Sequence, residues 1–287
     1  MRCRGEREST NVEDQRGARI GRPGMAISGA GLLLLLALSL LTGQSPLTLL
    51  DQLNSTQVSM EPSGQPGNQH EAPADELGEF ASVVLASTED VWHDLFNHRS
   101  QPYREPHLVL FSDSVDSACG YASSAVGPFY CPSDSKVYLD LTFFHELARR
   151  FKAPGDFAQA YVIAHEVGHH VQNLLGLSDR VRRAQQDGSQ EDANALSVRL
   201  ELQADCLAGV WGFHANQTRN LLEPGDVDDG LRAAAAIGDD QLQRSAGHSV
   251  QPESWTHGSS AMRSRWLRRG LETGDMNRCD TFSASSL

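Results

Sequence analysis

The segment HEVGH at residues 165–169 constrains this chain more than any other feature of the sequence. Apolar side chains recur at helical spacing over residues 157–175, which predicts a buried helix around it. Residues four apart lie on one face of a helix, so the imidazoles of His165 and His169 can reach one metal ion. Glu166 lies beside the first histidine, where its carboxylate can act as a base without binding the metal. The alternative is a pair of core histidines satisfied by hydrogen bonds.

A third ligand is expected further along the chain. The metzincin pattern requires Gly at position 172 and His at position 175, and the chain has Gln172 and Leu175 there. Among the downstream acidic residues, Glu201 is the best candidate because Asp205 follows it on the same helix face. Asp205 is expected to accept the free N–H of a ligand histidine. The alternative is two solvated charges on one helix.

These residues predict one zinc ion per chain, held by His165, His169 and Glu201. Three protein ligands with an open fourth position are typical of catalytic zinc, whereas structural sites are usually closed by four. Glu166 would accept a proton from the activated water and deliver it to the leaving amine. His257 is the candidate oxyanion donor, and a histidine that only caps the following helix is an equal alternative.

The N-terminal part of the sequence predicts a membrane anchor. Residues 25–42 form an uncharged, leucine-rich run long enough for a short transmembrane helix. Arginines precede this run and acidic residues follow it, which predicts a cytoplasmic N-terminus. A cleaved signal peptide is the alternative, but no A-x-A site follows the run. We therefore expect a cytoplasmic basic leader at residues 1–24 and a single-pass anchor at residues 25–42, with the remainder outside the cell membrane.

The rest of the chain predicts a linker and one domain. Residues 43–76 are rich in Gln, Ser, Pro, Gly and Asn, which is typical of a flexible linker. Residues 77–287 are expected to form an α+β domain, with a small antiparallel or mixed sheet packed on a mostly helical bundle. The expected strands are 107–111, 127–130 and 136–140, and the expected later helices are 157–175, 191–214, 226–237 and 258–271.

Charge and cysteine content add two expectations. The formal net charge of -13 argues against nucleic acid as a partner. Four of the five cysteines follow the apolar run, and an even number on an exported side is typical of two disulfides. Of the three possible pairings we favour Cys119–Cys131, which closes a short loop, together with Cys206–Cys279. Free buried thiols or a second metal site are the alternatives.

Five separated motifs together resemble the bacterial family of putative neutral zinc metallopeptidases. The motifs are GPFYCP from residue 127, VYLD from 137, HEVGHH from 165, ELQADCLAG from 201 and THGSS from 256. The resemblance covers residues 77–287 and implies a compact zincin-like fold of the glutamate-ligand type on a single-pass membrane protein. It implies zinc binding by His165, His169 and Glu201, and a general base at Glu166.

A more distant similarity, to other small glutamate-ligand peptidases, concerns the substrate. It implies that His257 and Arg263 support the substrate or the transition state. It also implies that a polypeptide substrate pairs with the strand beside the active-site helix, which we assign to residues 136–140. The expected function is a membrane-anchored zinc endopeptidase acting on exported polypeptides. The alternative is a catalytically silent, zinc-binding envelope scaffold, and the presence of Glu166 favours the peptidase.

Overall fold

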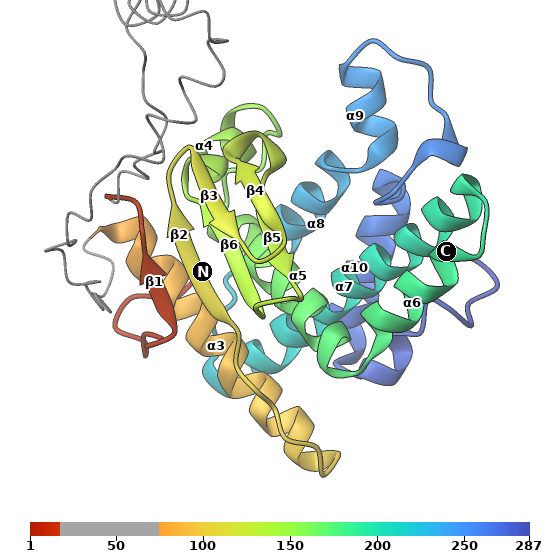
Figure 1. Cartoon of the computed structure of the whole chain (residues 1–287). Helices are drawn as coiled ribbons and strands as arrows, with labels where there is room; N and C mark the ends of the chain where they lie inside the picture. The colour runs from red at the N-terminus through yellow and green to blue at the C-terminus, as the bar shows by residue number, and fades with distance from the viewer. Residues whose placement is uncertain (18–74) are drawn as a thin grey trace, which may run out of the picture. The chain divides into compact units, whose positions relative to one another are not determined.

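The computed structural model describes residues 1–17 and 75–287. Helices dominate these residues, and two small sheets lie on one side of them (Figure 1), which confirms the predicted α+β class. The strands are β1 (Val12–Asp14), β2 (His107–Phe111), β3 (Ser114–Ser117), β4 (Gly120–Ser123), β5 (Phe129–Cys131) and β6 (Lys136–Asp140). The helices are α3 (Glu76–His98), α4 (Thr142–Arg149), α5 (Asp156–Leu174), α6 (Leu177–Gln186), α7 (Gln190–Arg219), α8 (Asp226–Ala236), α9 (Asp239–Ser245) and α10 (Ser260–Thr273).

The predicted anchor lies outside the described residues. It comprises residues 25–42, and most of the predicted linker at residues 43–76 lies outside them as well. Within residues 1–17 and 75–287, no helix is long and apolar enough to cross a membrane.

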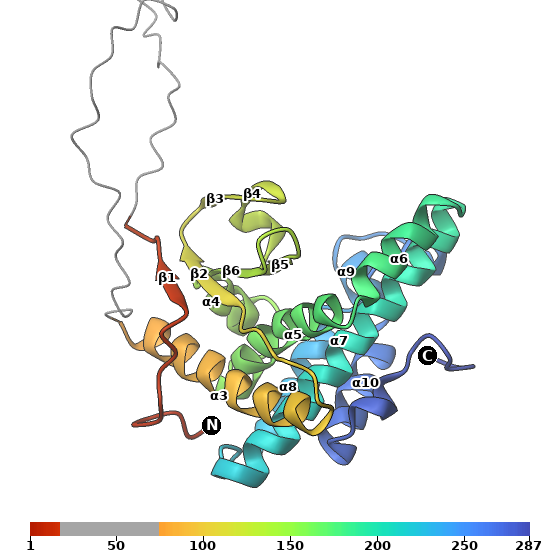
Figure 2. The ribbon, with the colours of Figure 1, turned by 60° about the horizontal axis from the view of Figure 1, so that its bottom comes forward.

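The first residues of the chain, for which the sequence predicts a leader at residues 1–24, contain the strand β1. Residues 1–17 belong to the same compact unit as the domain, and β1 pairs with β2 in parallel (Figure 2). Val12 is only 4% exposed and joins the main hydrophobic core. The sequence carried little signal for this strand, because three residues with two carboxylates show no usable periodicity.

The main sheet has the strand order β1-β2-β6-β5. β6 is parallel to β2 on one side and antiparallel to β5 on the other. β2 pairs with β6 along residues 136–140 and β5 pairs with it along residues 136–138, and the pairing of a substrate with residues 136–140 stays a prediction from the sequence. The free edge on this side belongs to β5.

Close helix contacts at small residues place α5 and α7 beside each other. A Cβ on Gly168 of α5 would lie 3.0 Å from the carbonyl oxygen of Ala204 on α7, so only glycine fits without displacing that backbone. A Cβ on Gly270 of α10 would overlap the carbonyl oxygen of Cys206 on α7. The three helices lie side by side in Figure 2, and α7 forms the middle of this layer.

The predicted disulfides are both present. Cys119–Cys131 links the β3–β4 hairpin to β5, and Cys206–Cys279 links α7 to the short 3-10 helix Met276–Cys279. Cys3 is the free cysteine of the residues that the structure describes. Each disulfide holds a segment that borders the site described next.

Candidate metal centre

Three side chains from two helices converge on one point. His165 and His169 extend from α5, and Glu201 extends from α7. His165 Nε2 lies 3.2 Å from one carboxylate oxygen of Glu201, and His169 Nε2 lies 3.4 Å from the other. One potential ligand atom from each residue lies within 4.8 Å of the others. The structure thus brings together the three ligands that the sequence predicts.

Asp205 holds the first histidine. Nδ1 of His165 donates to Asp205 Oδ1 at 2.9 Å, which is the contact expected from the sequence. Asp205 is fully buried and also accepts hydrogen bonds from the hydroxyl of Tyr161 and from Nε and Nη2 of Arg263. This carboxylate is therefore fixed from three sides, and His165 has its Nε2 left for the metal position.

Gln172 holds the second histidine, and sequence reasoning missed it. Nδ1 of His169 donates to Gln172 Oε1 at 2.9 Å. The Gln172 amide donates in turn to the carbonyl of Leu200 and to the side chain of Gln203. Gln203 then donates to the carbonyl of Cys279. Gln172 is fully buried, so this relay orients His169 through neutral groups alone.

The charged groups of the site raise the pKa of His165 and lower the pKa values of Asp205 and Glu201. Burial disfavours the charged form of His165, but the carboxylates of Asp205 and Glu201 outweigh it and raise its pKa to about 10. Burial raises the pKa of Asp205, but Arg263 and His165 outweigh it and lower that pKa to about 2. Burial also raises the pKa of Glu201, but the two histidines outweigh it and hold that pKa well below its usual value. A metal cation here would take the place of the proton that these groups attract.

The donor set fits zinc. Ligands at about 2.1 Å from a tetrahedral zinc ion lie roughly 3.4 Å from one another. The observed separations of 3.2 and 3.4 Å between the Nε2 atoms and the Glu201 oxygens match this spacing. Two imidazoles and one carboxylate form a set found in catalytic zinc sites. Nδ1 of both rings is already bonded, so both Nε2 atoms can coordinate.

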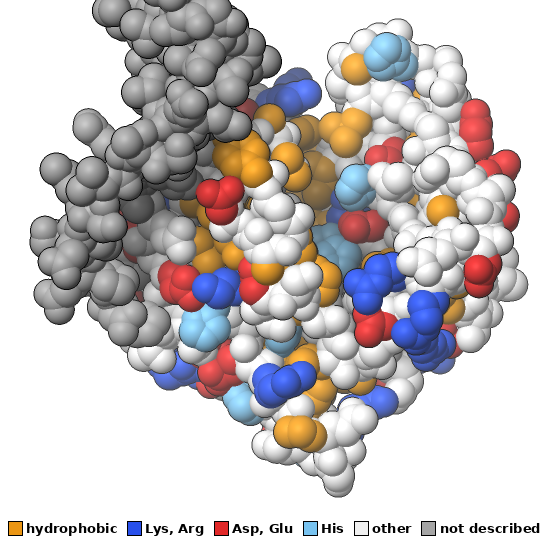
Figure 3. Space-filling model, viewed as in Figure 1, with side chains coloured by type: hydrophobic (Ala, Val, Ile, Leu, Met, Phe, Trp, Pro, Cys, Tyr) orange, Lys and Arg blue, Asp and Glu red, His pale blue; other side chains and the backbone are white. Residues whose placement is uncertain are grey.

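The site lies in a cleft of about 660 Å³ between β5 and the helices. Figure 3 shows the hollow, with histidine and acidic side chains gathered inside it. Glu166 is 8% exposed and lines the cleft together with the three ligands. Its place on α5, one residue after His165, leaves its carboxylate beside the metal position and outside the ligand set.

His257 lies on the rim of this cleft, where it is about half exposed. Its Nδ1 lies 3.2 Å from Oδ1 of Asp239, and the hydrogen bond to this carboxylate raises the pKa of His257. The other oxygen of Asp239 accepts from the backbone N–H groups of residues 256–258. Asp239, which the sequence analysis missed, therefore fixes both the loop and the ring of His257.

Arg263 is 2% exposed and lies behind the site. Its Nε and Nη2 are bonded to Asp205, and Nη2 also donates to Tyr161. Its Nη1 has no hydrogen-bond partner among residues 1–17 and 75–287, and the residue contributes to the cleft lining. The structure shows that Arg263 supports Asp205. A contact between Arg263 and a substrate stays a prediction.

His170 connects the metal-site helix to the edge strand. Its Nε2 donates to the carbonyl of Arg104, so in the neutral ring Nδ1 accepts from the hydroxyl of Tyr130 on β5. Burial lowers the pKa of His170 to about 4, so the ring is neutral at neutral pH. Asn173 donates to the same hydroxyl. These contacts fix the distance between β5 and the ligand histidines.

Comparisons with known proteins agree with this site. Residues 1–282 match the sequence profile of the family described as "Putative neutral zinc metallopeptidase". The uncharacterized protein YpfJ of Escherichia coli K12 is 46% identical over 290 residues, covering 99% of this chain and 100% of that protein. The uncharacterized protein Rv2575 of Mycobacterium tuberculosis H37Rv is 48% identical over 211 residues, covering 70% and 69% of the two chains. No solved structure matches this chain.

Proposed function

Because this chain belongs to the putative neutral zinc metallopeptidase family, we propose that it is a zinc-dependent endopeptidase that cleaves polypeptides in the cleft beside β5. The observation that carries the proposal is the convergence of His165, His169 and Glu201 with Glu166 at their side. Zinc, when bound, supplies the Lewis acidity that activates water and polarises the scissile carbonyl.

The residues of the chain supply the other steps. The carboxylate of Glu166 accepts the proton of the attacking water and later delivers it to the leaving amine. The ring of His257, on the cleft rim, donates a hydrogen bond to the oxygen on which negative charge develops. Asp239 favours the protonated form of that ring and keeps it oriented.

The peptide substrate pairs with β5. This strand lies at the end of the sheet, and Phe129 and Tyr130 line the cleft. An extended peptide added there gains backbone hydrogen bonds along the free edge. Apolar residues of the cleft wall, including Phe143, Phe151 and Val162, favour a substrate with an apolar side chain near the scissile bond.

The location proposed for the domain is extracytoplasmic. Two disulfides support it, because disulfides persist in oxidising compartments and are rare in the cytoplasm. Membrane attachment through residues 25–42 stays a prediction from the sequence, as these residues lie outside the described ranges.

The test is zinc content and peptide cleavage by the full chain, compared between wild type, Glu166→Gln and Glu201→Ala. We expect about one zinc per chain in wild type and in Glu166→Gln, and strong loss of zinc in Glu201→Ala. Cleavage of a peptide library should occur with the wild type alone. Equal cleavage by Glu166→Gln would contradict the proposal, and zinc binding without any cleavage by the wild type would favour a scaffold.

A further inference from the structure

The segment 1–17, which we call the N-terminal arm, is attached to the catalytic domain along its length. Its strand β1 extends the sheet at β2, where Val12, Glu13 and Asp14 pair with residues 108–110. Near the other end, the ammonium group of Met1 lies 3.1 Å from the carboxylate of Glu223 and 3.2 Å from that of Asp226. The arm thus bridges the sheet and the region before α8.

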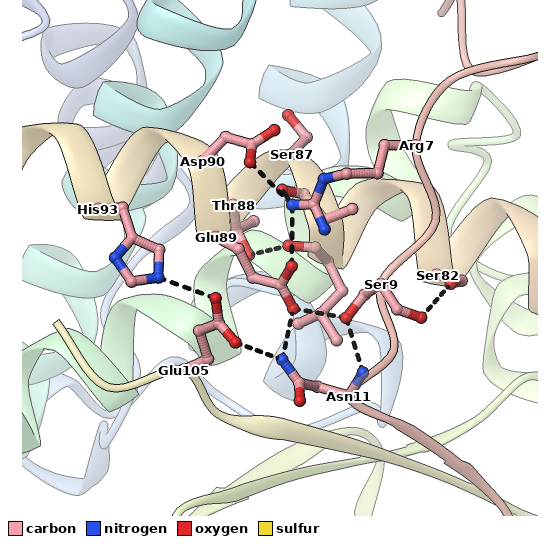
Figure 4. Close-up of polar contacts among 12 residues, drawn as sticks. Arg7, Ser9, Asn11, Ser82, Ser87, Thr88, Glu89, Asp90, His93 and Glu105 are labelled. Carbon is pink, nitrogen blue, oxygen red and sulfur yellow. Dashed lines mark hydrogen bonds and ion pairs between the residues drawn. The ribbon is translucent and has the colours of Figure 1, made fainter. Parts of the chain in front are cut away.

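The strongest sign that the arm belongs here is a buried carboxylate on the domain. Glu89 of α3 is 2% exposed. Its hydrogen-bond partners within the described residues are Arg7, Ser9 and Asn11, all from the arm (Figure 4). A buried charge that loses its partners is strongly destabilising. The domain therefore needs the arm to supply the hydrogen-bond partners of this buried carboxylate.

Contacts on either side of Glu89 repeat the pattern. Nη2 of Arg7 also donates to the carbonyl of Ala86 at 2.7 Å and to Asp90 at 2.8 Å. Ser9 and Ser82 exchange two hydrogen bonds, from the Ser9 N–H to the Ser82 carbonyl and from the Ser82 hydroxyl to the Ser9 carbonyl. Ser82 is fully buried, so this backbone contact lies inside the fold.

The relatives point the same way. The family profile begins at residue 1, and the Escherichia coli relative aligns with 99% of the chain. The arm therefore lies within the length of chain that the family profile matches.

We infer that the N-terminal arm and the domain of residues 75–287 form one folding unit in a single compartment. A single membrane crossing between residues 17 and 75 would put every arm on the opposite side from every domain. Neither the chain's own arm nor that of a second copy could then reach Glu89. This inference replaces the predicted topology with a cytoplasmic leader and an extracytoplasmic domain, and it does not depend on the proposed catalysis.

Cysteine labelling in whole cells tests the shared compartment. Glu8 is exposed on the arm and His248 is exposed on the domain, and neither lines the cleft. Each is changed to cysteine in the full chain, in a Cys3→Ser background in which the other four cysteines are paired. Bacteria with a permeabilised outer envelope are treated with a membrane-impermeant maleimide before or after lysis, with a cytoplasmic enzyme as control.

We expect Glu8→Cys and His248→Cys to be labelled to the same extent before lysis. Labelling of His248→Cys before lysis but of Glu8→Cys only afterwards would overturn the inference. If both react only after lysis, the shared compartment stands, and the extracytoplasmic location proposed above is wrong. Peptidase activity is measured separately, so its failure would leave this result intact.

A second measurement tests docking on the purified full chain. Arg7→Ala, Glu89→Gln and the double variant are compared by chemical denaturation. If Arg7 and Glu89 interact, the effects of the two substitutions should not add. The folding equilibrium constant of the double variant should then be at least about fivefold larger than the sum of the two single effects predicts. Additive effects would mean that the arm does not occupy this position in solution.

Discussion

Nδ1 of His169 donates a hydrogen bond to Oε1 of Gln172, one helical turn further along the same helix. His165 is held by a carboxylate and His169 by a carboxamide, so the two ligand rings are oriented by groups of different charge. Because the carboxamide is neutral, His169 is oriented without a further negative charge beside the metal position.

Gln172→Ala is expected to weaken zinc binding by about 10- to 100-fold, because an outer partner that fixes a ligand ring has an effect of this size. The measurement is competition with a chromogenic chelator. Gln159→Ala, on the same helix and away from the site, serves as the matched control and should bind zinc like the wild type. Equal affinities of Gln172→Ala and Gln159→Ala would show that the contact does not orient His169.

Arg263→Met is expected to lower the free energy of unfolding by about 3–5 kcal/mol, because it leaves the buried carboxylate of Asp205 with its main positive partner removed. Denaturation with a chelator present separates this effect from zinc binding. Arg268→Met, an exposed position on α10, is the control. Adding Asp205→Asn should recover part of the loss, since the charge is then gone. A double variant less stable than Arg263→Met would argue against this pairing.

The stability of the fold is expected to fall between pH 6.5 and pH 4 through His170. Burial lowers the pKa of His170 in the folded protein to about 4, below the ordinary histidine value of about 6.5, so the unfolded chain binds the extra proton in this window. The contribution is complete above pH 6.5 and decreases by about 3 kcal/mol down to pH 4. The ring faces Tyr103, Tyr130 and the backbone of Arg104.

The pH effect is measured by denaturation with a chelator at several pH values, for wild type and His170→Gln. The difference between the two proteins isolates this histidine from the other titrating groups. That difference should change with pH from 4 to 6.5 and stay constant above. A constant difference throughout would show that folding does not change the pKa of His170.

His257→Phe is expected to lower kcat by about 10²- to 10³-fold while zinc affinity stays unchanged, since one donor to the developing oxyanion has an effect of this size. Asp239→Asn should shift the alkaline limb of the pH–rate profile to lower pH, because loss of the carboxylate removes the cause of the raised pKa of His257. Wild-type kcat in His257→Phe would leave this histidine as a helix-cap residue.

The parts of the site that the sequence predicted are those fixed by helical spacing. His165 with His169, and Glu201 with Asp205, are pairs four apart, and each pair needs only a helix to share a face. Gln172 was noted only as a mismatch to another pattern, because its role depends on Gln203 from a different helix. Asp239 and the edge position of β5 depend on contacts distant in sequence, and no local pattern records them.

The N-terminal arm escaped prediction for a related reason. Arg16 belongs to the basic flank that predicts the membrane segment, while in the fold it pairs with Asp14 and Asp75. Arg7, earlier in the arm, pairs with Glu89 and Asp90. A charge count cannot separate these roles, because the acidic partners of Arg7 lie 82 and 83 residues away in the chain.

The relay from His169 through Gln172 and Gln203 to Cys279 also sets an order of events in time. A chain whose synthesis has just passed Asp205 carries all three ligands, but neither Arg263 nor Cys279 yet exists to orient Asp205 and Gln203. At about 5–20 residues per second, these groups follow some seconds later. The nascent chain therefore holds a loosely arranged set of metal donors, and a shaped catalytic centre arises only after α10 and the Cys206–Cys279 bond have formed.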